Sequence, residues 1–303
     1  MSFIVGTLLL AVVTASACAV PGVFVVLRKH SMLIDAIGHA ILPGIALGYL
    51  FTNNLNSPVV IVCAALAGVL VVLGAQWLGD SGLVIGDAPQ GLIFPALFSV
   101  GVILITSHFS NVHLDTHAVL VGDLNLAAWH QLSLGGVQIG PVYLYIMLAV
   151  LVLNVAVIGL FYPQLLASTF DGQFARSIGV PVGMLSIAFM FLVSLTVTAA
   201  FNAVGAILVI ALVVIPAAAA KQLATTVPRM MALTVLLAAV GAVAGFGVAY
   251  LLDAPTSATM TVIYGLEFLS CALWARWTRQ TRRSPTRRPL RVSRAQVEVA
   301  GRR

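Results

Sequence analysis

The sequence predicts an all-α fold: a polytopic membrane helical bundle of about nine transmembrane helices with a short cytosolic helix. Only 8% of the 303 residues are charged and 61% are hydrophobic, whereas a soluble domain is about 25% charged. Apolar runs of about 20 residues, long enough to cross a bilayer, recur along the chain. Basic clusters also fall on one side of the membrane when these runs are counted as spans.

The first apolar run starts close to the N-terminus and ends at Arg28-Lys29. An Ala-Ser-Ala sequence at 15–17 resembles a cleavage site, but no basic n-region precedes it and the run continues beyond it, so a transmembrane helix is predicted. Nine spans are expected in all, near residues 3–27, 32–52, 57–78, 89–107, 135–162, 183–200, 203–220, 229–251 and 256–275.

The basic residues between the spans predict the orientation. Arg176, the Lys221/Arg229 pair and the C-terminal tail are separated from Arg28-Lys29 by four, six and eight expected spans. Even numbers place all these clusters on one side, which the positive-inside rule makes the cytosol. The N-terminus is then outside and the C-terminus is cytoplasmic.

Two domains are expected: a transmembrane domain over 1–277 and a basic cytosolic tail over 278–303. Ten of the fifteen basic residues lie at or after Arg276, and the tail is expected to be disordered. Beside a membrane helix this charge favours contact with anionic lipid over nucleic acid. Between the fourth and fifth spans, 108–134 is expected to contain a short re-entrant or interfacial helix.

A further connection, between the fifth and sixth spans, is predicted to form a short amphipathic helix at about 168–181. Ser168 or Thr169 is expected to cap it, and Gly179 to end it before Pro181 starts the next span. Three large apolar residues share one face at four-residue spacing: Phe170, Phe174 and Ile178. Such a face suits either a partner protein or packing on the chain's own bundle.

Asp35 and His39 are the candidate metal ligands. At i and i+4 they project from one face of the second span, and ionisable residues there cost about 2.5–3.5 kcal/mol each on insertion scales. A carboxylate with an imidazole suits a borderline divalent cation. The alternative is a polar cluster at the membrane boundary, in which Asp35 pairs with His39 or Arg28.

One chain supplies two such ligands, and two chains about a two-fold axis supply four, the number in a tetrahedral zinc site. Manganese would need further oxygens.

Pro43 frees the backbone carbonyl of His39, and Ala40, Gly44 and Gly48 form a small-residue stripe suited to close helix contact.

Other ionisable residues offer weaker candidates. His108, His113, Asp115, His117 and His130 could form an outer metal funnel or simply be solvated loop residues. Glu267 in the last span is expected to bond a neighbouring helix rather than to move with an ion.

Several motifs are absent from the sequence. There is no Gly-x4-Gly-Lys-Ser/Thr phosphate loop, so the chain is not an enzyme that hydrolyses ATP, and it binds no cofactor of its own. Three cysteines, Cys18, Cys63 and Cys271, lie far apart in apolar runs and form neither a disulfide framework nor a zinc spacing.

Five segments in order resemble the membrane permease subunits of ATP-binding-cassette importers for manganese, zinc and iron. The first, at 25–44, reads Val-Val-Leu-Arg-Lys-His-Ser-Met-Leu-Ile-Asp-Ala-Ile-Gly-His-Ala-Ile-Leu-Pro-Gly. The other four are at 91–105, 113–124, 170–181 and 204–218, and the resemblance covers roughly 5–275.

The resemblance implies a multi-pass protein of the bacterial cell membrane that works with other subunits. These are cytosolic ATPases that bind ATP, a second permease (identical or paralogous) and an extracellular or periplasmic metal-binding protein. It implies that Asp35 and His39 coordinate the passing ion and that 168–181 is the coupling helix inserted into the ATPase. The coupling positions that match are Phe170, Asp171, Phe174, Ala175, Arg176 and Gly179, whereas Gly172-Gln173 replaces the more usual Pro-Glu.

The expected function is therefore ATP-driven import of a divalent transition metal. The His-Leu-Asp-Thr-His and Gly-Asp-Leu sequences at 113–124 resemble the manganese-associated branch of this family, which implies manganese, with zinc or ferrous iron as alternatives. A gradient-driven transporter, in which Asp35, His39 and Glu267 carry protons, is a second hypothesis. An intramembrane enzyme using the Asp–His pair as acid and base is a third, although no nucleophile motif supports it.

Overall fold

The computed structural model describes residues 3–53, 57–84, 88–108, 124–134 and 137–282. Within these residues, nine helices are long and apolar enough to cross a membrane, as expected. They are α1 (Phe3–Leu27), α2 (Ser31–Thr52), α3 (Pro58–Asp80), α4 (Ala88–His108), α7 (Val142–Leu160), α10 (Val182–Val204), α11 (Ala206–Leu223), α12 (Val227–Leu252) and α13 (Thr256–Arg282). The last helix thus extends five residues past the expected boundary at 277.

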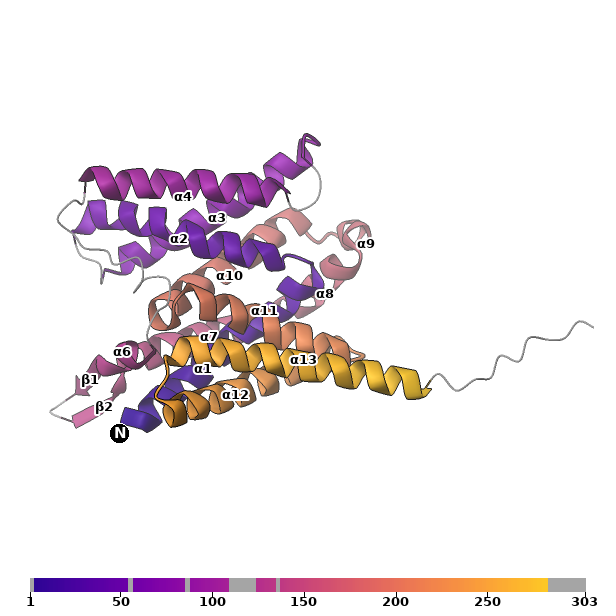
Figure 1. Ribbon diagram of the computed structural model, residues 1–303. Coiled ribbons are helices and arrows are strands. Elements are labelled where there is room, and N and C mark those ends of the chain that lie inside the picture. The colour runs from indigo at the N-terminus through magenta and orange to yellow at the C-terminus, as the bar shows by residue number, and fades with distance from the viewer. Residues whose placement is uncertain (1–2, 54–56, 85–87, 109–123, 135–136, 283–303) are drawn as a thin grey trace, which may run out of the picture.

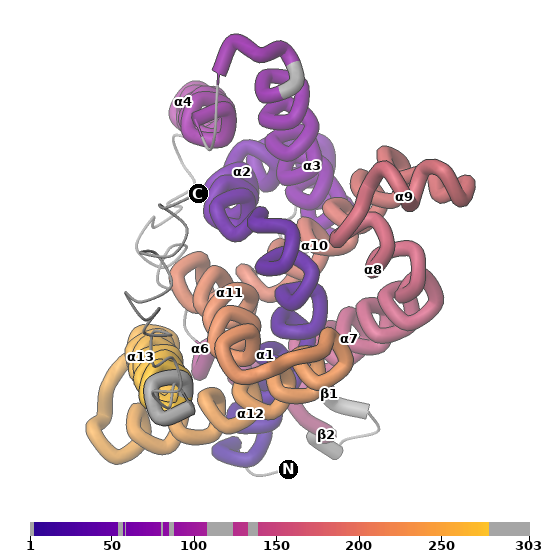
Figure 2. The backbone as a smooth tube through the Cα atoms, turned by 90° about the vertical axis from the view of Figure 1, so that its right-hand side faces the viewer, coloured from indigo at the N-terminus to yellow at the C-terminus, as the bar shows by residue number. Residues whose placement is uncertain are grey.

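The spans run side by side and alternate in direction (Figure 1). Helix α1 lies inside the bundle, where it packs against α7, α11 and α12, and most of its residues are buried. Helices α2, α3 and α4 form a group to one side of it (Figure 2). Helices α4 and α13 are peripheral, so most of their side chains face outward.

The two ends of the bundle differ in structure. One end carries the α1–α2 corner, two short helices between α7 and α10, and the C-terminal end of α13 (Figure 1). The opposite end carries the start of α1, the short helix α6 (Leu124–Trp129) and a β-hairpin. Arg28, Arg176 and the end of α13 therefore lie at one end, in agreement with the parity of the spans.

The β-hairpin was not predicted. Strands β1 (Gln131–Leu134) and β2 (Val137–Pro141) pair antiparallel, with Leu132 opposite Gly140. The expected start of the fifth span at 135 is wrong, because β2 occupies 137–141 and α7 begins only after Pro141. The short helix expected in 108–134 is α6, and residues 109–123 of that connection lie outside the described part of the chain.

The single helix predicted at about 168–181 is also wrong. Two helices stand there, α8 (Tyr162–Phe170) and α9 (Gly172–Ser177), separated by Asp171. Asp171 has extended backbone angles, φ −145° and ψ 94°. Its side chain caps α9, the role that had been expected of Ser168 or Thr169.

Candidate functional site

Asp35 and His39 lie on one face of α2, as their spacing predicts. The Nε2 atom of His39 is 3.6 Å from Oδ1 of Asp35. The side chains are 33% exposed for His39 and 46% exposed for Asp35, so the rest of the chain leaves part of each uncovered. Met32 and Leu50, which fall on the same helical stripe, are also exposed. Pro43 and Ala46, which fall on the same side of α2, are buried, so the stripe faces outward over only part of its length, which includes Asp35 and His39.

Two aromatic side chains of α4 fix the orientation of the imidazole. The His39 ring stacks on Phe94, with centroids 5.1 Å apart and planes at 25°. Phe98 approaches the same ring edge-on at 5.9 Å. Contacts on two sides limit rotation of the ring, and its Nε2 atom lies toward Asp35.

Close backbone packing holds α2 itself in place. A Cβ atom on Gly44 would lie 2.8 Å from the Cys63 carbonyl oxygen, and one on Gly48 would lie 2.7 Å from the Cα of Val60. Both contacts are with α3, which confirms the predicted small-residue stripe as a helix contact. On the α4 side, a Cβ on Gly101 would lie 2.8 Å from the Pro43 nitrogen. Larger side chains at these glycines would push α2 away from α3 and α4.

The ligand set of one chain is incomplete. No group of three or more His, Cys, Asp or Glu side chains suited to a metal occurs among the described residues. Asp35 and His39 thus offer two donors, fewer than the four to six that zinc or manganese takes. A metal site built on this pair would need further ligands from water, backbone or a second chain.

The outer candidates are not brought into this site. His113, Asp115 and His117 lie outside the described residues, so their role stays a prediction. His130 follows α6 and is exposed at the end of the bundle opposite the α1–α2 corner.

Glu267 differs from the expectation that it bonds a neighbouring helix. Both carboxylate oxygens are covered, and neither has a hydrogen-bond partner among the residues that the structure describes. Its Oε2 atom faces α12, where it would lie 2.7 Å from a Cβ on Gly241. The adjacent Tyr264 donates its hydroxyl hydrogen to the Ala238 carbonyl at 2.5 Å, and so does not bond the carboxylate.

Arg28 does not extend toward Asp35, so of the two pairings in the polar-cluster alternative only that of Asp35 with His39 occurs. Its guanidinium donates from Nε to Thr169 Oγ1 at 3.0 Å and from Nη2 to Ser168 Oγ at 2.9 Å. It also lies 5.0 Å from the centre of the Phe189 ring of α10, a cation–π distance. Sequence reasoning missed this junction, because it treated Ser168 and Thr169 as helix caps.

The neighbouring His30 is enclosed at the same corner. Burial lowers the pKa of its imidazole, and the positive charge of Arg28 lowers that pKa further. Its Nδ1 atom is buried and has no hydrogen-bond partner among the described residues. His30 is therefore expected to be neutral at physiological pH.

Helix α9 presents apolar side chains at the end of the bundle. Asp171 Oδ1 accepts hydrogen bonds from the backbone nitrogens of Gln173, at 3.0 Å, and Phe174, at 2.9 Å. Ala175 is fully buried, whereas Phe170, Phe174 and Ile178 are each more than half exposed. The segment is thus anchored through one small residue and leaves its large apolar side chains uncovered.

Gly179 ends α9, as predicted. Its φ of +84° is in the left-handed region. The Gly179 nitrogen donates to the Arg176 carbonyl at 3.0 Å, and the Val180 nitrogen donates to the Ala175 carbonyl at 3.0 Å. This pair of bonds is a Schellman motif, in which glycine avoids the strain of a Cβ atom.

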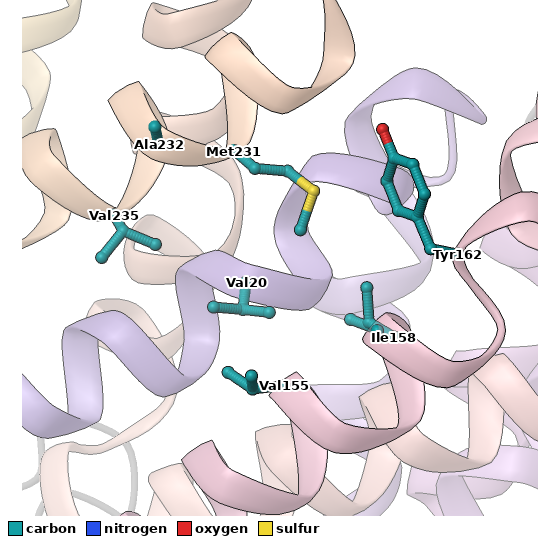
Figure 3. A pocket seen from close by; sticks show the side chains of 8 residues that line it. Val20, Val155, Ile158, Tyr162, Met231, Ala232 and Val235 are labelled. Atoms are coloured by element: carbon teal, nitrogen blue, oxygen red, sulfur yellow. The ribbon is translucent and has the colours of Figure 1, made fainter.

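A pocket of about 300 Å³ lies away from the ligand pair, between α1, α7 and α12 (Figure 3). Its lining side chains are apolar except for the hydroxyl of Tyr162 and the thioether of Met231. No carboxylate or imidazole lines it, so it offers no path for a divalent cation.

Comparison with known proteins gives consistent matches along nearly the whole chain. The family described as "ABC 3 transport family" matches residues 1–275. The chain is 36% identical over 275 residues to "Manganese transport system membrane protein MntD" of Bacillus subtilis, covering 91% of this chain and 93% of that protein. It is 38% identical over 260 residues to "Zinc transport system membrane protein TroD" of Treponema pallidum, covering 86% and 71%.

Among solved structures, the fold is similar to that of PsaBC from Streptococcus pneumoniae in complex with Fab. The TM-score is 0.76 with 26% identity, and the match covers 93% of this chain and 96% of that one.

Proposed function

The chain belongs to the ABC 3 transport family, and from this premise we propose that it is the permease subunit of an ATP-driven importer that moves Mn²⁺ into the cytosol. The observation that carries the proposal is the Asp35–His39 pair, 3.6 Å apart on the outward stripe of a closely packed membrane helix. ATP is bound and hydrolysed by partner subunits.

Manganese is the preferred cargo because the relative matched over 93% of its length is named for manganese transport. One carboxylate oxygen and one imidazole nitrogen per chain suit Mn²⁺, Zn²⁺ and Fe²⁺ alike, and disfavour Cu⁺, which prefers sulfur ligands. Zinc, for which another relative is named, and ferrous iron are the alternatives.

The site is completed by a second permease, identical or paralogous. The exposed ligand stripe of α2 would face the corresponding stripe across a two-fold axis, which supplies four protein ligands. Water or backbone oxygens would complete the coordination of Mn²⁺. Few ligands at an interface also let the ion leave, as conduction requires.

The partner subunits would bind at opposite ends of the bundle. At the basic, cytosolic end, the end of α8 and α9 would enter a groove of the ATPase through Phe170, Phe174 and Arg176. Asp171 and Gly179 set the ends of α9, and Ala175 holds it to the bundle. At the outer end, α6 and the hairpin would meet the extracellular or periplasmic metal-binding protein. The basic tail at 278–303 would lie on the anionic cytoplasmic lipid surface.

The proposal is tested by reconstitution into liposomes. The chain is purified with its ATPase and metal-binding partners, and uptake of radioactive Mn²⁺ is measured with ATP or with a non-hydrolysable ATP analogue. We expect uptake with ATP alone, and competition by excess Zn²⁺ or Fe²⁺ ranks the alternative metals. Uptake by the chain without an ATPase, driven by a proton gradient, would instead identify a secondary transporter.

A further inference from the structure

We propose that Arg28 is a positioning residue that transmits movement of the ATPase-docking segment, α8 and α9, to the metal-bearing helix α2. This inference rests on the proposed function and concerns how ATP hydrolysis reaches the metal site. The residues that it joins are about 140 positions apart in the sequence.

In the hydrogen bonds at Arg28, neighbouring bonds fix which group donates and which accepts. The Thr169 hydroxyl donates to the Leu165 carbonyl at 2.6 Å, and the Ser168 hydroxyl donates to the same carbonyl at 3.1 Å. Their hydrogens are thus used within α8, and their oxygen lone pairs accept from the guanidinium. Two parallel bonds from one planar group fix an orientation as well as a distance. Helix α8 and the end of α1 are therefore held together at this point.

The corner that follows Arg28 is short and internally bonded. Lys29 takes a left-handed conformation with φ of 62°, and the His30 nitrogen donates to the Val25 carbonyl at 2.9 Å. The Leu33 nitrogen donates to the His30 carbonyl at 3.0 Å. Helix α2 therefore starts directly on this corner, and Asp35 stands in its second turn. A displacement of the guanidinium would move the start of the ligand-bearing helix.

On the other side, Arg28 bonds the last turn of α8. Phe170 ends α8, and Asp171, the next residue, caps α9. No flexible linker separates the hydroxyls from the docking helix. The connection thus runs from α9, through α8 and the Arg28 side chain, to the corner at which α2 begins. Phe189 of α10 lies against the guanidinium, so this third helix also touches the junction.

The test measures uptake and ATP hydrolysis in the same liposomes, and their ratio is the readout. We expect Arg28→Ala to lower Mn²⁺ uptake per ATP hydrolysed about tenfold while ATPase activity stays within about twofold, because hydrogen bonds to a charged group are lost. Arg28→Lys keeps the charge but loses the planar fork, so an intermediate ratio is expected.

A second pair of substitutions tests the same contact from the other side. Ser168→Ala with Thr169→Val removes both acceptors without touching Arg28, and should reproduce the loss. Combining these with Arg28→Ala should add nothing further, since residues that share one interaction are not additive. Arg229→Ala, which removes an exposed arginine at the start of α12, is the matched control and should keep the wild-type ratio.

Each alternative outcome is distinguishable. A wild-type complex without ATP-dependent uptake contradicts the proposed function itself. A wild-type complex that transports, together with an unchanged uptake-to-ATP ratio in Arg28→Ala or in the Ser168/Thr169 variant, overturns the coupling role alone. A proportional fall in uptake and ATPase activity also overturns it, because that is the signature of a residue that merely stabilises the fold.

Discussion

Asp35 and Glu267 are both carboxylic acids inside membrane-spanning helices, but their surroundings are opposite. Asp35 on α2 is 46% exposed and lies 3.6 Å from the His39 imidazole. Glu267 on α13 has both oxygens covered and lacks a hydrogen-bond partner within the described part of the chain. One acid can be reached from outside the chain, and the other is enclosed by it.

The difference shows that an acidic residue in an apolar span is not enough to indicate a transport site. Each carboxylate costs free energy in the membrane, so each needs an explanation. Asp35 has a second ligand on the same stripe and an open side from which an ion or another chain can approach. Glu267 has neither, and both of its carboxylate oxygens are covered.

The largest expected effect is that of Asp35→Asn. Asparagine keeps the shape of the side chain and removes the charge that a divalent ion requires. We expect Mn²⁺ accumulation to fall at least about tenfold, since even groups that only support metal ligands are worth about 10- to 100-fold. Accumulation is measured in cells that express equal amounts of wild-type and variant protein. Wild-type accumulation in the variant would remove Asp35 from the metal site.

Gly241→Ala tests how closely α12 and α13 pack around Glu267. The new Cβ would lie 2.7 Å from both Glu267 Oε2 and Tyr264 Cδ1, so one of the helices has to shift. Overpacking of this kind destabilises by about 1–3 kcal/mol, and we expect a lower apparent Tm in detergent. Gly247→Ala on the same helix is the control, because nothing lies within 4 Å of its Cβ position. Equal Tm values for the two variants would mean that α12 and α13 are less closely packed.

His30 gives a smaller, pH-dependent effect. Its folded-state pKa is lowered by burial and by Arg28, so the unfolded chain binds the proton more readily. The contribution of this group to stability is therefore complete above the unfolded pKa of about 6.5 and is lost as pH falls through the lower folded pKa. The Tm of the wild type should fall more between pH 7.5 and 5.5 than that of His30→Gln. Identical slopes would argue against enclosure of this imidazole.

The smallest effect is expected for Glu267→Gln. Glutamine has nearly the same shape and no charge to desolvate, so Mn²⁺ accumulation should stay within about twofold of wild type and stability should not decrease. The assay is the same as for Asp35→Asn, which makes the two variants a direct comparison. A loss as large as that of Asp35→Asn would bring back the hypothesis of a proton-carrying transporter.

The nine spans, and which of their ends lie at the same end of the bundle, could be predicted from the sequence. The length of each apolar run and the basic residues between runs both reflect the membrane itself. Two local features were missed although a signal existed. Gly135-Gly136 lies between alternating polar and apolar residues, which is typical of a hairpin. Asp171 followed by Gly172 combines a strong N-cap residue with a weak helix former, and α8 ends there.

The candidate site was predictable only in part, for a physical reason. Asp35 and His39 are one turn apart, so helix geometry alone brings them together. Phe94 and Phe98, which orient the imidazole, come from another helix, and no local pattern pairs them with His39. The partners of Arg28 lie 140 and 141 residues away. Contacts of this range depend on how the helices pack, which the spacing of residues within one helix does not determine.

The caps of α9 have a consequence for assembly. A helix of six residues is too short to persist in water by its own propensity. Here Asp171 closes one end and the Schellman turn at Gly179 closes the other, while Ala175 ties the middle to the bundle. The conformational entropy of ordering this helix is therefore lost when the chain folds, and not again when a partner binds. Under the proposed function, its apolar side chains would form and break the same contact in each transport cycle without local unfolding.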